Sequence, residues 1–178
     1  MFEIVWIAVT AIGTWCLVGV TLWMTERHHK VALTNLRVRH EMLFVDRWES
    51  KAMRQARQIL ARQLLAKASD EEIQESVLDF WESVGCYWLH KYLLENLVWS
   101  DFGHCVVRWW PACKAYVEEQ QRRNQNDQTI YLYFNKLAHR MLEIDARERD
   151  LEQPESLGSD DINRFLRGEA ALECGNSN

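Results

Sequence analysis

Few residues in this chain form turns or interrupt helices. Its 178 residues include only 7 Gly and 2 Pro. Tight hairpins depend on such residues, so the composition argues against a many-stranded sandwich or barrel. The frequent residues are Leu, Glu, Arg, Gln and Ala, which favour helices. Because the length suits one ordinary domain, we predict an all-α fold.

The chain also lacks the short motifs that carry common chemistry. It contains no HExxH, GxSxG, P-loop or Rossmann glycine pattern and no CxxC pair. Its 5 cysteines are an odd and irregularly spaced set, which indicates reduced thiols and not a disulfide framework. The sequence therefore favours a protein that is not an enzyme and binds no cofactor, with no catalytic or metal-ligating residue.

One long run of the chain, residues 4–24, carries no charge. At about 1.5 Å per residue such a helix is roughly 31 Å long, which matches a hydrocarbon core of about 30 Å. Trp6 and Trp23 lie near its ends, where indoles favour the headgroup region. A cleaved signal peptide fits poorly, because Glu3 replaces the usual basic start and no small-x-small cleavage site follows. We predict a transmembrane anchor over residues 1–25.

Charge around this run predicts its orientation. Arg27 and Lys30 follow it directly, and nothing basic precedes it except the N-terminal amine. The positive-inside rule therefore places the N-terminus outside and the C-terminal domain in the cytoplasm. We predict Trp6, Trp23, Arg27 and Lys30 as membrane-interface residues, with membrane lipids as partners.

Basic residues gather just after the anchor. Residues 26–67 contain ten Lys or Arg and four Asp or Glu, whereas residues 68–178 contain eleven and twenty-one. We predict continuous helix here, beginning with a basic juxtamembrane helix over residues 26–45. Arg47, Lys51, Arg54, Gln58 and Arg62 share one face at helical spacing. Three interpretations of this face remain open. It is exposed to solvent, it is attracted to anionic lipids, or it pairs with the acidic distal region within or between molecules. No nucleic acid is expected, because the whole chain is acidic and lacks a recognition motif.

Residues 46–149 carry the pattern of a bundle of about four helices. A capping box at Ser69 and Glu72 predicts a helix start. An apolar helical face follows: Val77, Phe80, Trp81, Val84 and Trp88. Gly85 indicates a kink or a close helix crossing, and Pro111 a kink or restart. The polar residues 120–128 predict a loop.

The last long helix of this bundle carries Ile130, Phe134, Leu137, Met141 and Ile144 at steps of three and four residues. Residues 150–178 read as a polar, partly disordered tail with a short helix near residues 162–167.

Cysteine, histidine and tryptophan concentrate between residues 81 and 113. Cys86 and His90 are four residues apart, and His104 and Cys105 are adjacent, with Cys113 further on. A zinc site could use such residues, but buried free cysteines more often act as small hydrophobes. For the paired indoles Trp109 and Trp110, with Trp99 and Trp88 nearby, core packing is the better interpretation, and any indole that stays exposed would mark a partner surface. The candidate interaction surface is therefore Arg47, Lys51, Arg54, Arg62, Trp99, Trp109 and Trp110.

Several segments between residues 55 and 144 share a theme of paired aromatics with glycine and basic ends: ARQIL, VLDFWESVG, LLENLVWSDFG, VVRWWPACKAYVEEQQRR and YFNKLAHRM. This organisation resembles small bacterial single-pass membrane proteins of the domain of unknown function 4760 type. The resemblance implies one membrane helix before a helical domain and brings no activity.

These features favour a membrane-anchored module facing the cytoplasm at a bacterial inner membrane. It would bind a protein partner, self-associate or serve as an accessory subunit. The alternative is a membrane-tethered ligand sensor or enzyme with a pocket lined by Trp, Cys and His.

Overall fold

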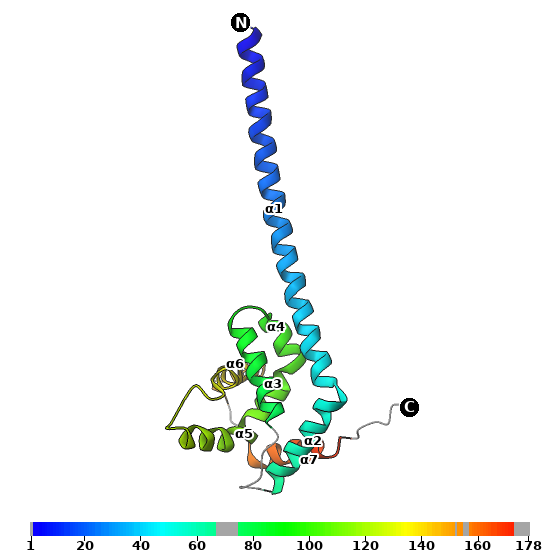
Figure 1. Cartoon of the computed structure of the whole chain (residues 1–178), viewed down its shortest axis with the longest axis vertical. Helices are drawn as coiled ribbons and strands as arrows, with labels where there is room; N and C mark the ends of the chain where they lie inside the picture. The colour runs from blue at the N-terminus through cyan, green and yellow to red at the C-terminus, as the bar shows by residue number, and fades with distance from the viewer. Residues whose placement is uncertain (1, 67–74, 152, 155–156, 173–178) are drawn as a thin grey trace, which may run out of the picture. The chain divides into compact units, whose positions relative to one another are not determined.

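A computed structural model describes the backbone of residues 2–66, 75–151, 153–154 and 157–172 (Figure 1). The side chains of residues 2–14, Cys16 and Lys30 lie outside this description. The described residues are all in helices or their connections, with no strand, which confirms the predicted all-α class. Compactness divides the chain into two units, Met1–Arg39 and His40–Asn178.

Two helices make up the N-terminal third of the chain: α1, Phe2–Glu49, and α2, Lys51–Ala66. The prediction of one continuous helix was wrong at Ser50. The Ser50 hydroxyl accepts a hydrogen bond from the backbone N–H of Met53 at 3.2 Å and donates one to the Arg47 carbonyl at 2.7 Å. Serine is a preferred N-cap because its oxygen satisfies an unpaired N–H of the first turn. It therefore starts a new helix here without Gly or Pro.

The remaining helices all belong to the second unit. They are α3 (Ser76–Leu89), α4 (Glu95–Val98), the π-helix η1 (Trp99–Gly103), α5 (His104–Arg123), α6 (Leu132–Glu148) and α7 (Ser159–Ala170). The predicted capping box falls outside the described residues. Helix α5 runs on through Pro111 to Arg123, so the loop predicted from residue 120 begins only after that residue.

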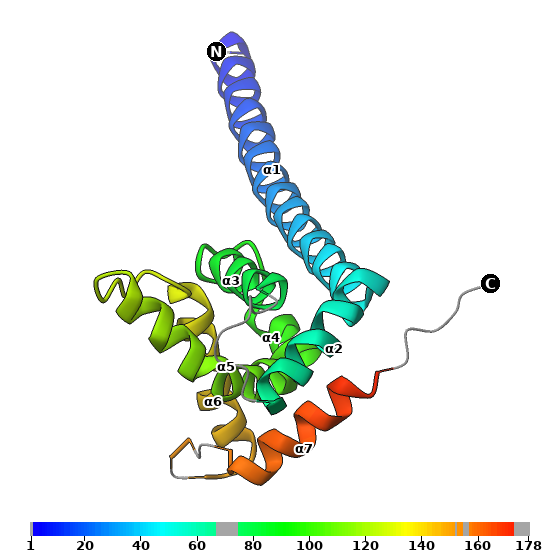
Figure 2. The ribbon, with the colours of Figure 1, turned by 60° about the horizontal axis from the view of Figure 1, so that its bottom comes forward.

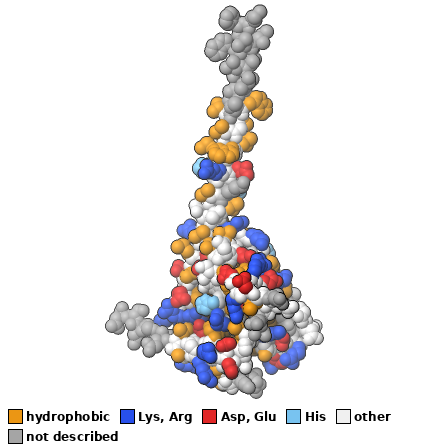
Figure 3. All heavy atoms as spheres, turned by 180° about the vertical axis from the view of Figure 1, so that it is seen from behind, with side chains coloured by type: hydrophobic (Ala, Val, Ile, Leu, Met, Phe, Trp, Pro, Cys, Tyr) orange, Lys and Arg blue, Asp and Glu red, His pale blue; other side chains and the backbone are white. Residues whose placement is uncertain are grey.

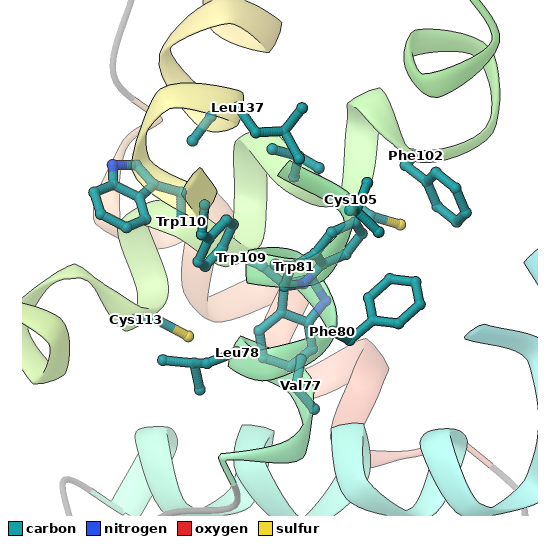
Figure 4. Close-up of a cluster of buried hydrophobic side chains, with 14 of the residues drawn as sticks. Val77, Leu78, Phe80, Trp81, Phe102, Cys105, Trp109, Trp110, Cys113 and Leu137 are labelled. Carbon is teal, nitrogen blue, oxygen red and sulfur yellow. The ribbon is translucent and has the colours of Figure 1, made fainter. Parts of the chain in front are cut away.

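Aromatic side chains fill the core of the second unit. Figure 4 shows Phe80, Trp81, Phe102 and Trp109 pointing into it, and all four are fully buried. Trp81 lies 5.0 Å from Phe80 and 5.8 Å from Phe102 between ring centroids, both edge-on. Such pairs contribute about 0.5–1.5 kcal/mol each beyond area burial. The apolar face predicted for residues 77–88 is confirmed as the buried face of α3.

Helices α3 and α6 cross closely at Gly85. A Cβ atom there would lie 2.3 Å from the Tyr133 carbonyl oxygen, so only glycine fits this crossing. One turn earlier, the Glu82 carboxylate accepts hydrogen bonds from the backbone N–H groups of Tyr133 at 3.2 Å and Phe134 at 2.7 Å. Helix α3 therefore supplies the N-terminal cap of α6. The predicted close crossing at Gly85 is confirmed.

Helix α7 extends the bundle beyond the boundary predicted at residue 149. It packs along α2, as Figures 1 and 2 show, and it buries Leu166 in the common core. The helix is also longer than the short segment expected at residues 162–167. The polar composition of this segment predicts a tail, but buried Leu166 and partly buried Ile162 and Phe165 pack α7 against the core. Residues 173–178, predicted to be disordered, lie outside the described residues.

In the part of the chain that the structure describes, no helix is both long and apolar enough to cross a membrane. The side chains of residues 1–14 and Cys16 lie outside that part. The anchor predicted over residues 1–25 depends mainly on those side chains and stays a prediction.

Replacing Gly85 by alanine should destabilise the bundle. The new methyl group would push against the backbone of α6, and overpacking of this kind costs about 1–3 kcal/mol. Chemical denaturation of the full-length protein in mild detergent, followed by circular dichroism, measures the change. Gly168→Ala is the matched control, because no atom lies within 4 Å of its new Cβ and alanine is the better helix former. Equal stabilities of the two variants would contradict the close crossing.

Candidate functional site

The residues of the basic face predicted on α1 and α2 make different contacts, and one group of them binds the end of α7. Gln58 Nε2 donates hydrogen bonds to the carbonyls of Ala170 at 3.3 Å and Leu172 at 3.0 Å, and Arg62 donates to Ala170 at 3.3 Å. Cationic and amide donors at a helix C-terminus stabilise its unpaired carbonyls and its dipole. Part of this face therefore holds the end of α7, which agrees with pairing inside the molecule.

The other basic residues of this face have separate roles. Arg54 forms an ion pair with Glu49 at 2.7 Å. The Arg47 guanidinium lies over the Phe80 ring, 5.7 Å from its centroid, and Lys51 is exposed. On this face, Arg47 and Lys51 therefore remain exposed with no ion pair among the described residues, and the Arg47 charge acts on the nearby Asp79 carboxylate.

Arg57 is a buried cation that was not predicted from the sequence, and the residue is only 5% exposed. Its guanidinium lies over the Trp48 indole at 4.2 Å from the ring centroid, and its Nε lies 3.5 Å from a Glu169 oxygen. No described protein group accepts a hydrogen bond from that Nε. Arg57 is spaced as part of the apolar stripe of α2, one position off the basic face. A charged residue in an apolar stripe was the signal that could have found it.

A polar cavity of about 320 Å³ opens beside Arg57. Five helices supply its walls: α1, α2, η1, α5 and the end of α7. The lining residues are Trp48, Glu49, Arg54, Arg57, Asp101, His104, Cys105, Glu169 and Leu172. Cations and anions therefore meet in one hollow, which can hold a small polar molecule by charge.

The π-helix η1 positions one residue of the cavity, Asp101, and one residue of the core, Phe102. Its wider turn carries Asp101 toward the cavity and buries Phe102 in the core. Gly103 is required because a Cβ there would lie 2.2 Å from the Trp99 ring. π-Helical turns occur frequently at functional sites, and the sequence WSDFG carries no local signal that distinguishes one from an ordinary α-turn.

The predicted pair of His104 and Cys105 lies in this cavity. The Cys105 sulfur is 3.5 Å from His104 Nε2. Burial, and then the negative charge of Glu169, raise the pKa of Cys105 to about 12, and burial followed by the Arg108 charge lowers the pKa of His104. Both groups are therefore neutral near pH 7. A thiol in this state is neither a good nucleophile nor a metal ligand.

A second cavity of about 440 Å³ holds the other predicted pair. It is lined by His40, Cys86, Tyr87, His90 and Tyr92. Cys86 Sγ lies 3.7 Å from His90 Nδ1, which confirms that these residues share one helix face. The two cavities have no lining residue in common, so the fold does not bring the two Cys/His pairs together.

The described residues contain no group of three or more His, Cys, Asp or Glu side chains that could hold a metal ion. Cys113 is buried in the core, and burial raises its pKa to about 12. The zinc hypothesis therefore has no support in this part of the chain.

The aromatic members of the predicted interaction surface differ in exposure. Trp109 is fully buried and Trp110 is 7% exposed, so both belong to the core, as the preferred core-packing interpretation predicted, and not to the candidate interaction surface. Trp109 packs edge-on against Phe165 of α7 at 5.3 Å. Trp99 is half-buried. Helices α6 and α7 cover α5 from different sides, so α5 is apolar around much of its circumference. From periodicity alone, such a helix cannot be told from one that presents an apolar face to a partner protein.

Of the predicted membrane-interface residues, Trp23 and Arg27 are exposed, and the Arg27 guanidinium lies over the Trp23 ring at 5.5 Å. The side chains of Trp6 and Lys30 lie outside the described residues.

Glu41 is a buried carboxylate near Asp101 of the cavity beside Arg57, and it was not predicted from the sequence. It is 3% exposed, and no described residue donates a hydrogen bond to either of its oxygens. Burial, and then the negative charge of Asp101, raise the pKa of Glu41 to about 7. An anion at this position is destabilising, because burial of an uncompensated charge is costly.

This burial should make stability pH-dependent. The carboxyl is protonated in both states below its ordinary pKa, so the penalty is absent there and develops as pH rises toward the folded-state value of about 7. Between pH 4.5 and pH 8 the wild type should lose about 1–3 kcal/mol relative to Glu41→Gln. Urea denaturation at each pH measures the difference. Parallel stability curves for the two proteins would contradict this assignment.

Comparison with known proteins gives one family. The family described as a domain of unknown function (DUF4760) matches residues 6–141, and the chain belongs to this family. The match includes most of residues 55–144, whose segments carry the resemblance, and it confirms the family itself. No curated protein matches the chain, and no solved structure matches it.

Proposed function

We propose that this member of the DUF4760 family is a single-pass membrane protein of the bacterial inner membrane. Its helical unit faces the cytoplasm and binds a protein partner. The uncharged run over residues 4–24, followed by Arg27 and Lys30, carries the proposal.

The described part of α1 supports this proposal. Figure 3 shows apolar side chains exposed along the part of α1 next to its grey end, and Trp23 and Trp15 are 60% and 75% exposed. Soluble monomers rarely expose contiguous apolar surface of this kind, so a lipid or protein environment is expected around it. The stacked pair of Trp23 and Arg27 suits a membrane boundary, where an indole lies at the headgroups and a guanidinium reaches toward water.

The partner surface that the contacts favour is smaller than the sequence predicted. Arg54 and Arg62 are occupied by Glu49 and by the end of α7, and the paired indoles lie in the core. Arg47 and Lys51 remain exposed on either side of the junction of α1 and α2, with Asp79 near Arg47. An acidic protein surface is the partner that fits them.

A second candidate function is ligand sensing, and the polar cavity beside Arg57 favours it. A small ligand there would contact α1, α2, α5 and α7 at once, so its binding would stabilise the packing of helices that are distant in sequence.

The anchor is tested by introducing charge. Val9→Arg with Ile12→Arg should abolish retention in the membrane pellet after alkaline carbonate extraction, because each arginine at a span centre costs about 2.5–3.5 kcal/mol. Ala52→Arg with Gln55→Arg adds the same charge at two exposed positions of α2 and should stay in the pellet. Extraction of the unaltered protein by carbonate would contradict the anchor.

The partner surface is tested by charge reversal. Arg47→Glu with Lys51→Glu should remove the proteins that crosslink to and copurify with the full-length chain in mild detergent. Lys136→Glu with Arg147→Glu changes the net charge equally at exposed positions of α6 and should retain them. If both double variants keep the same crosslinked partner, the surface lies elsewhere. Recovery of the monomer alone from the unaltered protein would contradict an interaction module.

A further inference from the structure

The cavity beside Arg57 is built around a buried cation with few partners. The Trp48 indole covers one face of the guanidinium, and Glu169 approaches a single nitrogen at 3.5 Å. Both Arg57 Nε and Glu169 Oε2 are buried, and neither makes a hydrogen bond to a described residue. A guanidinium has five N–H donors in a planar fork, so this one retains capacity to bind an anionic group.

The same cavity also contains carboxylate groups, and not all of them have a cationic partner. Arg54 and Glu49 neutralise each other at 2.7 Å. Asp101 lines the cavity and has no ion-pair partner among the described residues. Together, Glu169 and Asp101 carry more negative charge than Arg57 offsets. They can accept hydrogen bonds from a positively charged group, since carboxylates only accept.

We infer that this cavity binds a small zwitterion of the amino-acid class. The ligand's carboxylate pairs with Arg57, whose planar guanidinium matches it in two parallel hydrogen bonds. Its ammonium group is held by Asp101 and Glu169. The inference rests on the second candidate function and is independent of the membrane anchor.

Size and charge together select this class. A volume of about 320 Å³ is at the low end of small-molecule sites, which span roughly 300–1,000 Å³, and it suits a molecule as small as an amino acid. A simple carboxylate would leave the buried Glu169 oxygen without a donor, and a simple amine would leave the buried Arg57 without an anion. Discrimination against such analogues is strong where buried polar groups lose their partner.

The test uses full-length protein in mild detergent. Thermal unfolding is measured with each of the twenty L-amino acids in turn, and isothermal titration then gives the affinity of the best one. The matching 2-hydroxy acid lacks the ammonium group and the matching methyl ester lacks the carboxylate. We expect at least one amino acid to raise the unfolding midpoint, and both analogues to bind at least tenfold more weakly.

Variants locate the site. Asp101 is exposed, so Asp101→Asn should fold normally and weaken binding at least tenfold, whereas Asp46→Asn, another exposed aspartate, should bind as the wild type does. Arg57→Lys keeps the charge and loses the planar fork, and it should also weaken binding; circular dichroism checks that it folds.

Three results would overturn the inference. The first is the absence of binding by all twenty amino acids. The second is equal binding of the hydroxy acid or the ester, which would retain a ligand site and remove the zwitterion class. The third is undiminished binding to Asp101→Asn, which would place the site elsewhere. None of them bears on carbonate extraction, so the anchor stands or falls separately.

Discussion

The contact of α3 with α6 at Gly85 is the constraint on which the rest of the second unit depends. The absence of a side chain lets the backbone of α6 approach, and Glu82 caps its first turn from one turn earlier on α3. With these two helices in register, Phe134 stacks on Trp81 at 6.1 Å. The aromatic core therefore depends on one small residue and one carboxylate of the same helix.

The polar cavity forms because α7 packs against α2, a helix far from it in the sequence. Helix α7 is held there by its apolar contacts, by Gln58 and Arg62 at its C-terminus, and by Glu169 beside Arg57. The cost of burying the Arg57 charge is offset in part by the Trp48 indole, because cation–π contacts strengthen when desolvated. Buried charge is weak support for stability, and the Arg57 charge beside a cavity is the observation on which the proposed ligand site rests.

Sequence periodicity predicted the class of fold and the buried face of α3, because 3.6-residue spacing reports directly which side of a helix is covered. It also predicted that Cys86 and His90 share a face. It did not find the helix break at Ser50 or the π-helix, since both depend on a few local hydrogen bonds and not on apolar pattern. It left a partner surface open for Trp109 and Trp110 beside the preferred core packing, because a helix covered from two sides is apolar around much of its circumference.

The sequence by itself determined the all-helical class, the uncharged run over residues 4–24, the basic-then-acidic distribution of charge and the membership of a family that matches residues 6–141. These are properties of composition and short-range spacing. Only the tertiary structure decided that Arg57, Asp101 and Glu169 line one cavity. They lie on α2, η1 and α7, and residues so far apart in the chain meet only through the packing of the helices that carry them, which no local pattern encodes.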